Sequence, residues 1–434
     1  MAAIRIYNIF PRLLGHISNW HMHIPRIRAM GFDTIYLNPL SYPGFSGSLY
    51  AIKDHYAYNP MFFTSTERTV AEKELSAFIA ACGKQGISVM MDLVINHTAS
   101  DSALAKEHPA WYKKDKDGKF VSPGAWDDGK WVSWGDLIEI DNEATEDRKG
   151  LVSYWKKLIT AHIELGFTGF RCDAAYKVPA DMWKELITHA KKKGPMVFFA
   201  ETLGCPMKDV IALAGAGFDY IASSARWWNF HDDWCLTQYN ESRVHAPSVS
   251  FPENHDTMRT ITEYGGNINH VRLVMLLTAL LSAGWMITSG FEWGYRRRCD
   301  VVHGMPEDAE QIQYDISDHI RRINAFKNSH DVFRTEGDVR VVLPIDAPEK
   351  DDANGMKALA DADGKKNRVL GITKESSDGK STALIFFNTD VNTERTVDVS
   401  AFSIRKDISL DGALKAVPRG SITIAPGDAR IFLL

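Results

Sequence analysis

Two charged side chains lie two residues apart in the stretch 167–177, which reads FTGFRCDAAYK. The stretch begins with β-forming residues, and side chains two apart leave the same face of a strand, so Arg171 and Asp173 should lie together. A guanidinium within about 4–6 Å lowers the pKa of a carboxyl by about 1–3 units, which keeps a carboxylate ionised as a nucleophile. A plain salt bridge at a strand end is the competing interpretation.

Three further stretches join an apolar run of β-formers to carboxylate, amide or imidazole groups. They read DLVINH (92–97), FFAET (198–202) and FPENHD (251–256). In a parallel barrel the C-terminal ends of the strands open onto one face, where the following loops build the active site. We therefore expect one set of side chains to meet there: Asp92, Asn96, His97, Arg171, Asp173, Glu201, Asn254, His255 and Asp256.

Asp173 and Glu201 suit the cleavage of a glycosidic bond. Cleavage with retention needs one carboxylate as nucleophile and a second carboxyl about 5–5.5 Å away, which protonates the leaving oxygen and later deprotonates the acceptor. Glu201 follows the apolar run 196–200, and burial favours the neutral form of a carboxyl, as an acid requires. Taken singly, each acid fits a helix N-cap or a surface residue better than a catalytic role.

The elements that must position these residues alternate along the chain. Strands are predicted at 4–10, 34–39, 87–94, 167–173, 196–201, 218–222, 248–251 and 285–289. Helices are predicted at 24–30, 70–82, 148–165, 179–193, 207–216, 230–239, 268–282 and 316–326. Strict alternation of eight strands and eight helices predicts an α/β fold, the (β/α)8 TIM barrel. The stretch 42–60, rich in Gly, Ser, Pro and Tyr, is predicted as a surface loop with ligand-facing aromatic residues.

Two segments lie outside this alternation. Residues 98–146 show no sustained period, and a segment of that length inside a domain is normally functional or a small subdomain. Residues 333–434 hold short β-forming runs between Gly, Asp and Asn turns, which predicts an antiparallel β sandwich. The expected organisation is a barrel (1–97 and 147–332), an insertion (98–146) and a C-terminal β domain (333–434).

Composition narrows the class of protein. The 434 residues carry a net charge of −5, which argues against a nucleic-acid or anionic-membrane partner. The first residues lack the continuous apolar run of a secretory signal, and the apolar segment 271–287 falls short of a bilayer span and is expected to be a buried helix running into a strand. Five scattered cysteines without paired spacing argue against disulfides and zinc. We expect a cytoplasmic protein with a neutral, polar ligand. The sequence does not indicate which oligomeric state the protein has.

The four stretches, in this order, resemble the signature regions of the α-amylase family, glycoside hydrolase family 13. The resemblance covers the barrel and places the stretches on its third, fourth, fifth and seventh strands, with a short domain B after the third strand. It implies that Asp173 is the nucleophile and Glu201 the acid/base. It implies that Asp256 binds sugar hydroxyls and stabilises an oxocarbenium-like transition state.

The resemblance also implies substrate contacts. The family's histidines hydrogen-bond the sugar beside the cleaved bond, its arginine orients the nucleophile, and a tyrosine stacks on the sugar. The usual Gly-Tyr-Asp around that tyrosine reads Leu-Tyr-Ala here, and the lysine stands one place later than in the Lys-His pair of secreted amylases. The implied substrate-binding residues are Tyr50, His97, Arg171, Lys177 and His255.

Calcium is the one metal that the resemblance raises. Asn96 aligns with a calcium ligand of many secreted members, and Asp127, Asp128 and Asp136 are candidate partners. Because no D-x-D-x-D loop pattern accompanies them, we expect no metal and no cofactor. The tryptophans of the insertion, with Trp227 and Trp228, fit either sugar-stacking platforms or packing residues.

The expected activity is that of a retaining glycoside hydrolase acting on α-1,4-linked glucans or maltooligosaccharides through a covalent glycosyl-enzyme intermediate. The runs KVPADMWKELI and AETLGCPMKDVIALAGAGF resemble the maltosyltransferase branch, so a dedicated maltosyltransferase or glucanotransferase, using maltose 1-phosphate or maltooligosaccharides, is the alternative. An inactive binding subunit of the same fold is a third hypothesis. Such proteins usually lose one of the three acids, and all three are present here.

Overall fold

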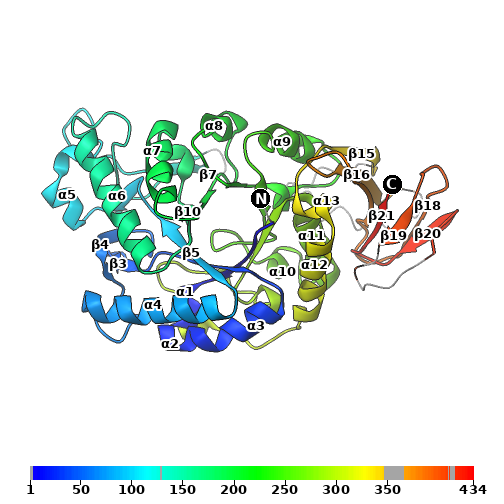
Figure 1. Cartoon of the computed structure of the whole chain (residues 1–434), viewed down its shortest axis with the longest axis horizontal. Coiled ribbons are helices and arrows are strands. Elements are labelled where there is room, and N and C mark those ends of the chain that lie inside the picture. The colour runs from blue at the N-terminus through cyan, green and yellow to red at the C-terminus, as the bar shows by residue number, and fades with distance from the viewer. Residues whose placement is uncertain (1–2, 128–129, 347–365, 409, 411–415) are drawn as a thin grey trace. The chain divides into compact units, whose positions relative to one another are not determined.

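Eight strands form a closed barrel in the computed structural model, which describes residues 3–127, 130–346, 366–408, 410 and 416–434 (Figure 1). The order around the barrel is β1–β14–β13–β12–β11–β10–β5–β2. All eight predicted barrel strands are confirmed, each within two residues of its expected bounds. They are β1 (Arg5–Ile9), β2 (Thr34–Leu37), β5 (Ser88–Leu93), β10 (Gly169–Cys172), β11 (Val197–Ala200), β12 (Tyr220–Ala222), β13 (Ser248–Ser250) and β14 (Gly284–Thr288).

The eight predicted helices also form. They are α3 (Ile24–Ala29), α4 (Arg68–Lys84), α6 (Arg148–Glu164), α7 (Ala180–Lys191), α8 (Met207–Ala212), α9 (Trp234–Ser242), α11 (Ile268–Leu281) and α12 (Ser317–Ser329). The side chain of Asn267 caps α11 by accepting hydrogen bonds from two backbone N–H groups of its first turn. Most of α11 is buried and β14 follows it, as the apolar run 271–287 predicts. No helix among the described residues is long and apolar enough to cross a membrane.

The stretch 42–60 differs from its prediction. Instead of a surface loop, an antiparallel hairpin forms here from β3 (Ser41–Pro43) and β4 (Ile52–Tyr58). The stretch contains all of this hairpin except its first residue. Leu49, Ala51 and His55 are buried. The prediction was wrong because α4, α5 (Ala103–Glu107) and β6 (His97–Ala99) pack against β4, a long-range contact that the local composition does not show.

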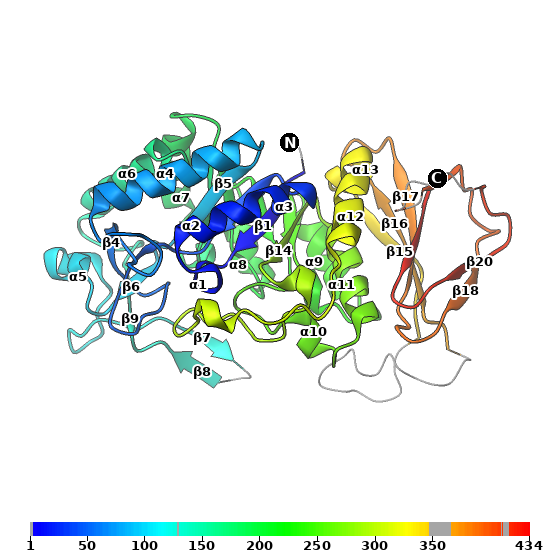
Figure 2. The same cartoon turned by 90° about the horizontal axis from the view of Figure 1, so that it is seen from below.

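The segment 98–146 folds around two short antiparallel ladders. Strand β6 pairs with β9 (Leu137–Glu139), so His97 lies on a ladder rather than on a free loop. Strands β7 (Gly124–Asp127) and β8 (Lys130–Ser133) form a hairpin (Figure 2).

The C-terminal segment is an antiparallel β domain, as predicted. One sheet has the order β15–β16–β17–β21–β19, and a second consists of β18 and β20. Phe386 and Phe432 of the first sheet pack with Ile422 and Ile424 of the second. The strands are β15 (Val339–Leu343), β16 (Val369–Glu375), β17 (Thr382–Asn388), β18 (Arg395–Asp398), β19 (Lys406–Ile408), β20 (Ser421–Ile424) and β21 (Ala429–Leu433).

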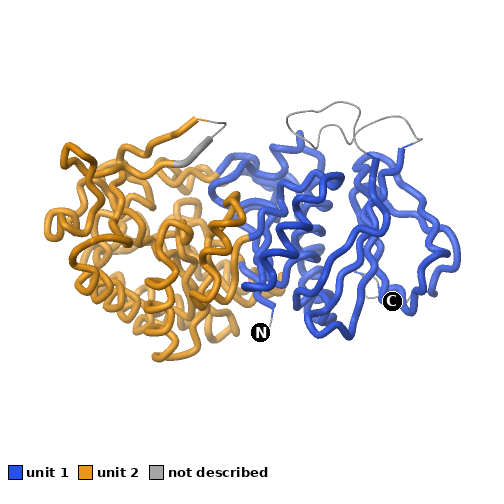
Figure 3. The backbone as a smooth tube through the Cα atoms, turned by 90° about the horizontal axis from the view of Figure 1, so that it is seen from above, with its two compact units in different colours: residues 1–6, 223–298, 310–434 blue, residues 7–222, 299–309 orange. Residues whose placement is uncertain are grey.

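The chain divides into two compact units (Figure 3). One contains 7–222 and 299–309, and therefore the first three of the four sequence motifs. The other contains 1–6, 223–298 and 310–434, and therefore the fourth motif and the C-terminal domain. The domain boundaries expected at 98, 147 and 333 stay a prediction.

Candidate active site

Asp173 and Glu201 follow two neighbouring parallel strands. Cys172, the last residue of β10, is the register partner of Ala200, the last residue of β11. The backbone N–H of Glu201 donates to the carbonyl of Cys172 at 3.1 Å, so the pairing continues to the acid itself. The two acids therefore leave the barrel side by side, each one residue beyond its strand.

Arg171 joins three carboxylates. Its Nη1 lies 2.7 Å from Oδ1 of Asp173 and 2.9 Å from Oδ1 of Asp92, and its Nη2 lies 3.2 Å from Oε2 of Glu201. The side chains of Arg171 and Asp92 are almost fully buried, whereas that of Glu201 keeps partial access to solvent. Arg171 and Asp173 thus share one face of the strand, as their spacing predicts. One guanidinium orients three acids from the third, fourth and fifth barrel strands.

The charges around Asp173 change the expected direction of its pKa shift. Burial raises the pKa of Asp173 well above its ordinary value, the Arg171 guanidinium opposes the rise, and the charges of Glu201 and Asp92 add to it. The prediction of a lowered pKa for Asp173 was wrong in its net direction, because the motif shows the arginine but not the two other carboxylates that share it. A neighbouring carboxylate raises the pKa of a carboxyl because two negative charges at close range repel each other.

Glu201 also accepts a hydrogen bond from the main chain. Its Oε2 lies 2.6 Å from the backbone nitrogen of Ala174, the residue after Asp173. Ala174 has φ +39°, in the left-handed region that non-glycine residues seldom adopt. The turn after the proposed nucleophile is therefore shaped so that its N–H points at the second carboxyl. Strain of this kind is concentrated at functional sites.

Tyr50 is fixed by a network that sequence reasoning missed in part. Its hydroxyl donates to Oδ2 of Asp92 at 2.6 Å, and the hydroxyl of Tyr36 donates to the same oxygen. Asn38 Nδ2 donates to the Tyr50 hydroxyl at 3.0 Å. The signal for Tyr36 and Asn38 was present, because both are polar residues at the C-terminal end of an otherwise apolar strand, like the members of the other motifs.

His97 is neutral and packs beneath the loop that carries Tyr50. Its Nε2 lies 3.1 Å from the carbonyl oxygen of Tyr50, so this nitrogen carries the proton and donates. Burial lowers the pKa of His97 to about 4. Its Nδ1, an acceptor in this tautomer, has no hydrogen-bond partner among the described residues.

Lys177 lies in a short 3-10 turn, Ala175–Lys177, at the surface of the same unit. Its ammonium group is 5.5 Å from the centre of the Tyr176 ring. A cation over an aromatic face at this distance is favourable.

His255 and Asp256 belong to the other unit, in the loop after β13. His255 is buried and its Nε2 lies 3.0 Å from Oδ2 of Asp256, while the Asp256 side chain remains 48% exposed. Asn254 Nδ2 donates to the same oxygen at 3.3 Å, and Arg298 Nη2 donates to the backbone carbonyl of Asp256 at 2.6 Å. The loop holds this carboxylate in a set orientation.

The candidate calcium ligands form no evident site. Asn96 is buried and its backbone carbonyl accepts from the N–H of Ile140 at 2.9 Å. Asp128 and the side chain of Asp127 lie outside the described residues. Within the described part of the chain, no group of three His, Cys, Asp or Glu side chains is arranged to hold a metal ion. All five cysteines are buried, and none of them is paired in a disulfide.

The tryptophans separate into packing residues and exposed rings. Trp111 and Trp228 are buried, whereas Trp131, Trp134 and Trp227 are 49%, 41% and 41% exposed. The indole of Trp131 lies against Gly124, where an added Cβ would approach its Cζ2 to 2.8 Å. One face of this ring is thus supported by the backbone of β7, which makes it a fixed platform. The side chain of Trp126 lies outside the described residues.

Comparison with known proteins finds relatives in sequence and in fold. Residues 1–119 match a family model described as glycogen debranching enzyme, glucanotransferase domain. An α-1,4-glucan:maltose-1-phosphate maltosyltransferase of Burkholderia pseudomallei is 24% identical over 80% of this chain and 31% of its own length, and that of Mycolicibacterium smegmatis is 26% identical over 71% and 47%. An α-amylase structure from Lactobacillus plantarum aligns with a TM-score of 0.73 at 19% identity, covering 100% of this chain and 98% of its own.

The chain is thus similar in sequence to maltosyltransferases and in fold to α-amylases. A second structure of the same fold, the α-amylase from Geobacillus thermoleovorans complexed with acarbose, has a TM-score of 0.74 at 16% identity and covers 99% of this chain and 98% of its own. The chain spans about a third to a half of the length of the maltosyltransferases that it matches. The two α-amylase structures, at 19% and 16% identity to this chain, show a shared fold.

Proposed function

We propose that this protein is a retaining enzyme that cleaves α-1,4 links in glucans or maltooligosaccharides. The observation that supports the proposal best is the single guanidinium of Arg171, which contacts Asp92, Asp173 and Glu201 at the ends of three barrel strands. Such a cluster places two carboxyls side by side and holds them in fixed orientation. These are the two requirements of double displacement.

In the proposed mechanism Asp173 attacks the anomeric carbon while Glu201 donates its proton to the leaving oxygen. A glycosyl ester on Asp173 results, and Glu201, now ionised, takes a proton from the incoming acceptor. We assign the nucleophile's role to Asp173 and the acid's role to Glu201, because Arg171 holds Asp173 at the shorter distance. We assign Asp256 the role of stabilising the positive charge that develops on the sugar.

Substrate contacts follow the same logic. Tyr50, held by Asp92, offers its ring to the sugar. We assign neutral His97 to the substrate on the resemblance of its motif. We assign His255 and Lys177 to the substrate as well, on the resemblance of their motifs. The mechanism as proposed uses side chains alone and requires no metal or other cofactor, and five reduced thiols support a cytoplasmic setting.

Transfer is the second candidate, because the relatives at 24% and 26% identity are maltosyltransferases. Hydrolysis and transfer share the glycosyl-enzyme intermediate and differ in whether water or a sugar hydroxyl attacks it. An inactive binding subunit is a weaker candidate, because all three acids are present and two of them are oriented by Arg171.

The test is a product profile of the purified protein with maltoheptaose, with and without inorganic phosphate, followed by chromatography. Shorter sugars alone would identify a hydrolase, and longer with shorter sugars a transferase. Release of maltose 1-phosphate in phosphate would place the protein with the phosphate-using transferases. No change with this substrate, with α-1,6-linked glucans or with disaccharides would contradict the proposal.

A further inference from the structure

Arg12 is a buried charge that the mechanism proposed above does not use. It lies in α1 (Pro11–Leu14), the short helix that follows β1, and is 4% exposed. Burial lowers the pKa of Arg12, the charge of Asp300 opposes the fall, and the guanidinium stays charged at pH 7. A buried charge is costly unless it is hydrogen-bonded, so the partners of this group show what it stabilises.

The guanidinium of Arg12 joins three segments of the chain. Its Nε donates to the carbonyl of Val301 at 3.0 Å, and its Nη1 donates to the carbonyl of Gly304 at 3.1 Å. Its Nη2 donates to the carbonyl of Gly47, in the hairpin of β3 and β4. All of these residues belong to one compact unit. One planar fork therefore ties the segment after β1 to the hairpin and to the segment 299–309, which follows β14 in the chain.

The segment 299–309 also contacts the other two segments directly. The N–H of Leu49 donates at 3.0 Å to the carbonyl of Val301, the same oxygen that accepts from the guanidinium. Pro306 lies against the end of α1, where a Cβ added to Gly15 would approach its Cγ to 2.7 Å. The three segments are thus packed and hydrogen-bonded to one another around a single side chain.

Tyr50 follows directly on the part of the hairpin that is held in this way. Gly47 accepts from Arg12, and Leu49 donates to the segment after β14. The carbonyl of Tyr50 accepts from Nε2 of His97 at 3.1 Å. The main chain at Tyr50 is therefore held from one side by the guanidinium and from the other by the imidazole.

The ring of Tyr50 lies beside the carboxylate cluster. The centre of the ring is 6.0 Å from the guanidinium carbon of Arg171, and its hydroxyl donates to Oδ2 of Asp92 at 2.6 Å. A shift of the hairpin would move the ring relative to both groups. A misplacement of about 1 Å caused by a change far from the chemistry can cost about 10²-fold in rate.

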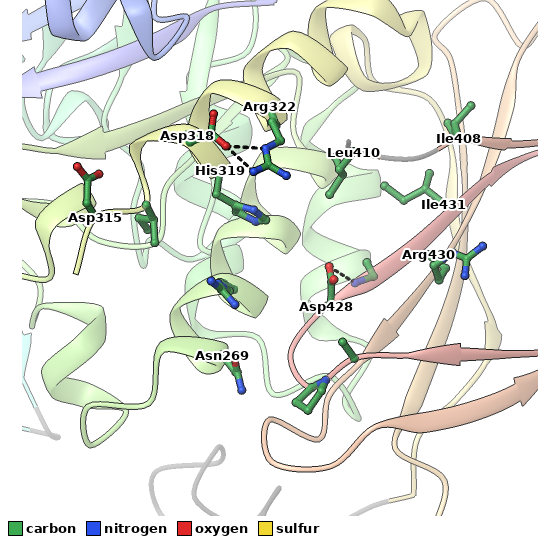
Figure 4. Close-up of a pocket in the computed structure, with 15 residues that line it drawn as sticks. Asn269, Asp315, Asp318, His319, Arg322, Ile408, Leu410, Asp428, Arg430 and Ile431 are labelled. Atoms are coloured by element: carbon green, nitrogen blue, oxygen red, sulfur yellow. Dashed lines mark hydrogen bonds and ion pairs between the residues drawn. The ribbon is translucent and has the colours of Figure 1, made fainter. Parts of the chain in front are cut away.

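Charged side chains that the mechanism leaves unused also line a cavity of about 590 Å³ between α11, α12 and the C-terminal sheet (Figure 4). Figure 4 shows Asp318 beside Arg322, whose Nε donates to it at 2.8 Å. None of the described residues that line this cavity takes part in the proposed mechanism. Arg12 differs from them, because its hydrogen bonds lead to the loop of a proposed substrate-binding residue.

We propose that Arg12 is a positioning residue for substrate binding, which acts through Tyr50 by fixing the hairpin of β3 and β4 to the segments after β1 and β14. The contact of Tyr50 with the sugar rests on the proposed function. Arginine suits this place better than lysine, because its planar fork donates to three carbonyls at once, whereas an ammonium acts as a single point charge.

The test is a double-mutant cycle for the binding of maltoheptaose, measured by ligand-observed NMR titration of the full chain with Glu201→Gln, which stops turnover. Arg12→Lys and Tyr50→Ala should each weaken binding by about tenfold or more. The double variant should bind no more weakly than Tyr50→Ala alone, because the effect of Arg12 passes through the ring. Arg28→Lys, at an exposed position on α3, is the control and should bind like the parent.

Hydrogen–deuterium exchange follows the hairpin itself and needs no ligand. Arg12→Lys should speed exchange by about tenfold or more in a peptide covering 44–51 and leave peptides of α4 unchanged. Should this variant fail to fold, Asp300→Ala is tested in the same way. Asp300 is exposed, and its carboxylate accepts from the N–H groups of Val302 and His303, so its loss loosens the segment 299–309 from the surface.

Two results would overturn the inference. One is a loss of affinity from Arg12→Lys that is equally large with and without the Tyr50 ring, or no loss at all, since the first indicates a general structural role and the second indicates none. The other is unchanged exchange in the peptide covering 44–51. Failure of the proposed function is distinguishable, because a parent protein that does not bind maltoheptaose contradicts the proposed substrate, and the exchange result then decides the role of Arg12.

Discussion

Oε2 of Glu201 lies 2.6 Å from the backbone nitrogen of Ala174, the residue next to Asp173. The second carboxyl is thus positioned by the turn that carries the first. Arg171 contacts both acids, so a substitution at one acid leaves the other in place. The two acids should therefore be distinguishable by the kinetics of their variants.

Asp173→Ala should lower kcat by about 10⁴-fold or more on every substrate, because a lost nucleophile cannot be replaced by a better leaving group. Glu201→Ala should be equally damaging with maltoheptaose but much less so with α-maltosyl fluoride, whose leaving group needs no proton. Steady-state rates on both substrates check this. Asp181→Asn, an exposed acid that pairs with Arg148 on the surface, is the control. Equal losses for the two variants on the fluoride would contradict the assigned roles.

Asp92→Asn should move the acidic limb of the pH–rate profile to lower pH. The charge of Asp92 contributes to the raised pKa of Asp173, so its removal lowers that pKa and the nucleophile ionises at a lower pH. The maximal rate should fall as well, because Tyr50 loses a charged acceptor. The profile is measured as kcat/KM from pH 4 to 8. A limb that stays in place or moves to higher pH would count against Asp173 as the titrating group.

Trp131→Ala should raise KM for maltoheptaose by about 2–12-fold and leave maltotriose nearly unaffected, if the supported indole acts as a platform for distant sugar units. Aromatic contacts contribute about 0.5–1.5 kcal/mol beyond area burial, which corresponds to this range. Val132→Ala, an exposed neighbour on the same hairpin, is the matched control. An equal effect on both sugars would indicate a general loss of hairpin structure instead.

Acid should destabilise the protein through its buried histidines. Burial lowers the pKa of His55, His97 and His270 to about 4 and that of His162 to about 3. The unfolded chain takes up these protons near pH 6.5, so stability is full above that pH and is lost as pH falls toward 4, by about 1–2 kcal/mol per histidine at pH 5. Urea unfolding at pH 7.5 and 5.0 measures the difference, and His162→Phe should make it smaller.

Lys327→Met should destabilise the unit formed by residues 1–6, 223–298 and 310–434 (unit 1 in Figure 3) by about 3–5 kcal/mol. The buried ammonium of Lys327 donates to the carbonyl of Ala279 in the last turn of α11 at 2.9 Å and to that of Ser282, the residue after the helix, at 2.5 Å. Each carbonyl left without a donor costs about 1–3 kcal/mol. Denaturant unfolding with Lys184→Met, an exposed lysine on α7, as the control provides the comparison. A variant as stable as the control would show that water replaces the ammonium.

The sequence by itself determined the barrel, the C-terminal β domain and the residues that end the strands. Period-2 and period-3.6 patterns are local, and each of the eight strands carries its own run of β-formers, so their order along the chain could be predicted without contacts. The pairing of Arg171 with Asp173 followed for the same reason, because two residues of one strand share a face.

Only the tertiary structure decided the features that depend on residues far apart in the chain. The net charge around Asp173 depends on Asp92 and Glu201, which reach Arg171 from neighbouring strands. The hairpin of β3 and β4 is buried because separate elements cover it, although its composition is that of a loop. Arg272 and Asp428 lie 156 residues apart and share a cavity only because the C-terminal sheet folds back onto α11 and α12. Propensity acts between near neighbours, whereas charge, burial and cavities are set by whichever side chains the fold brings together.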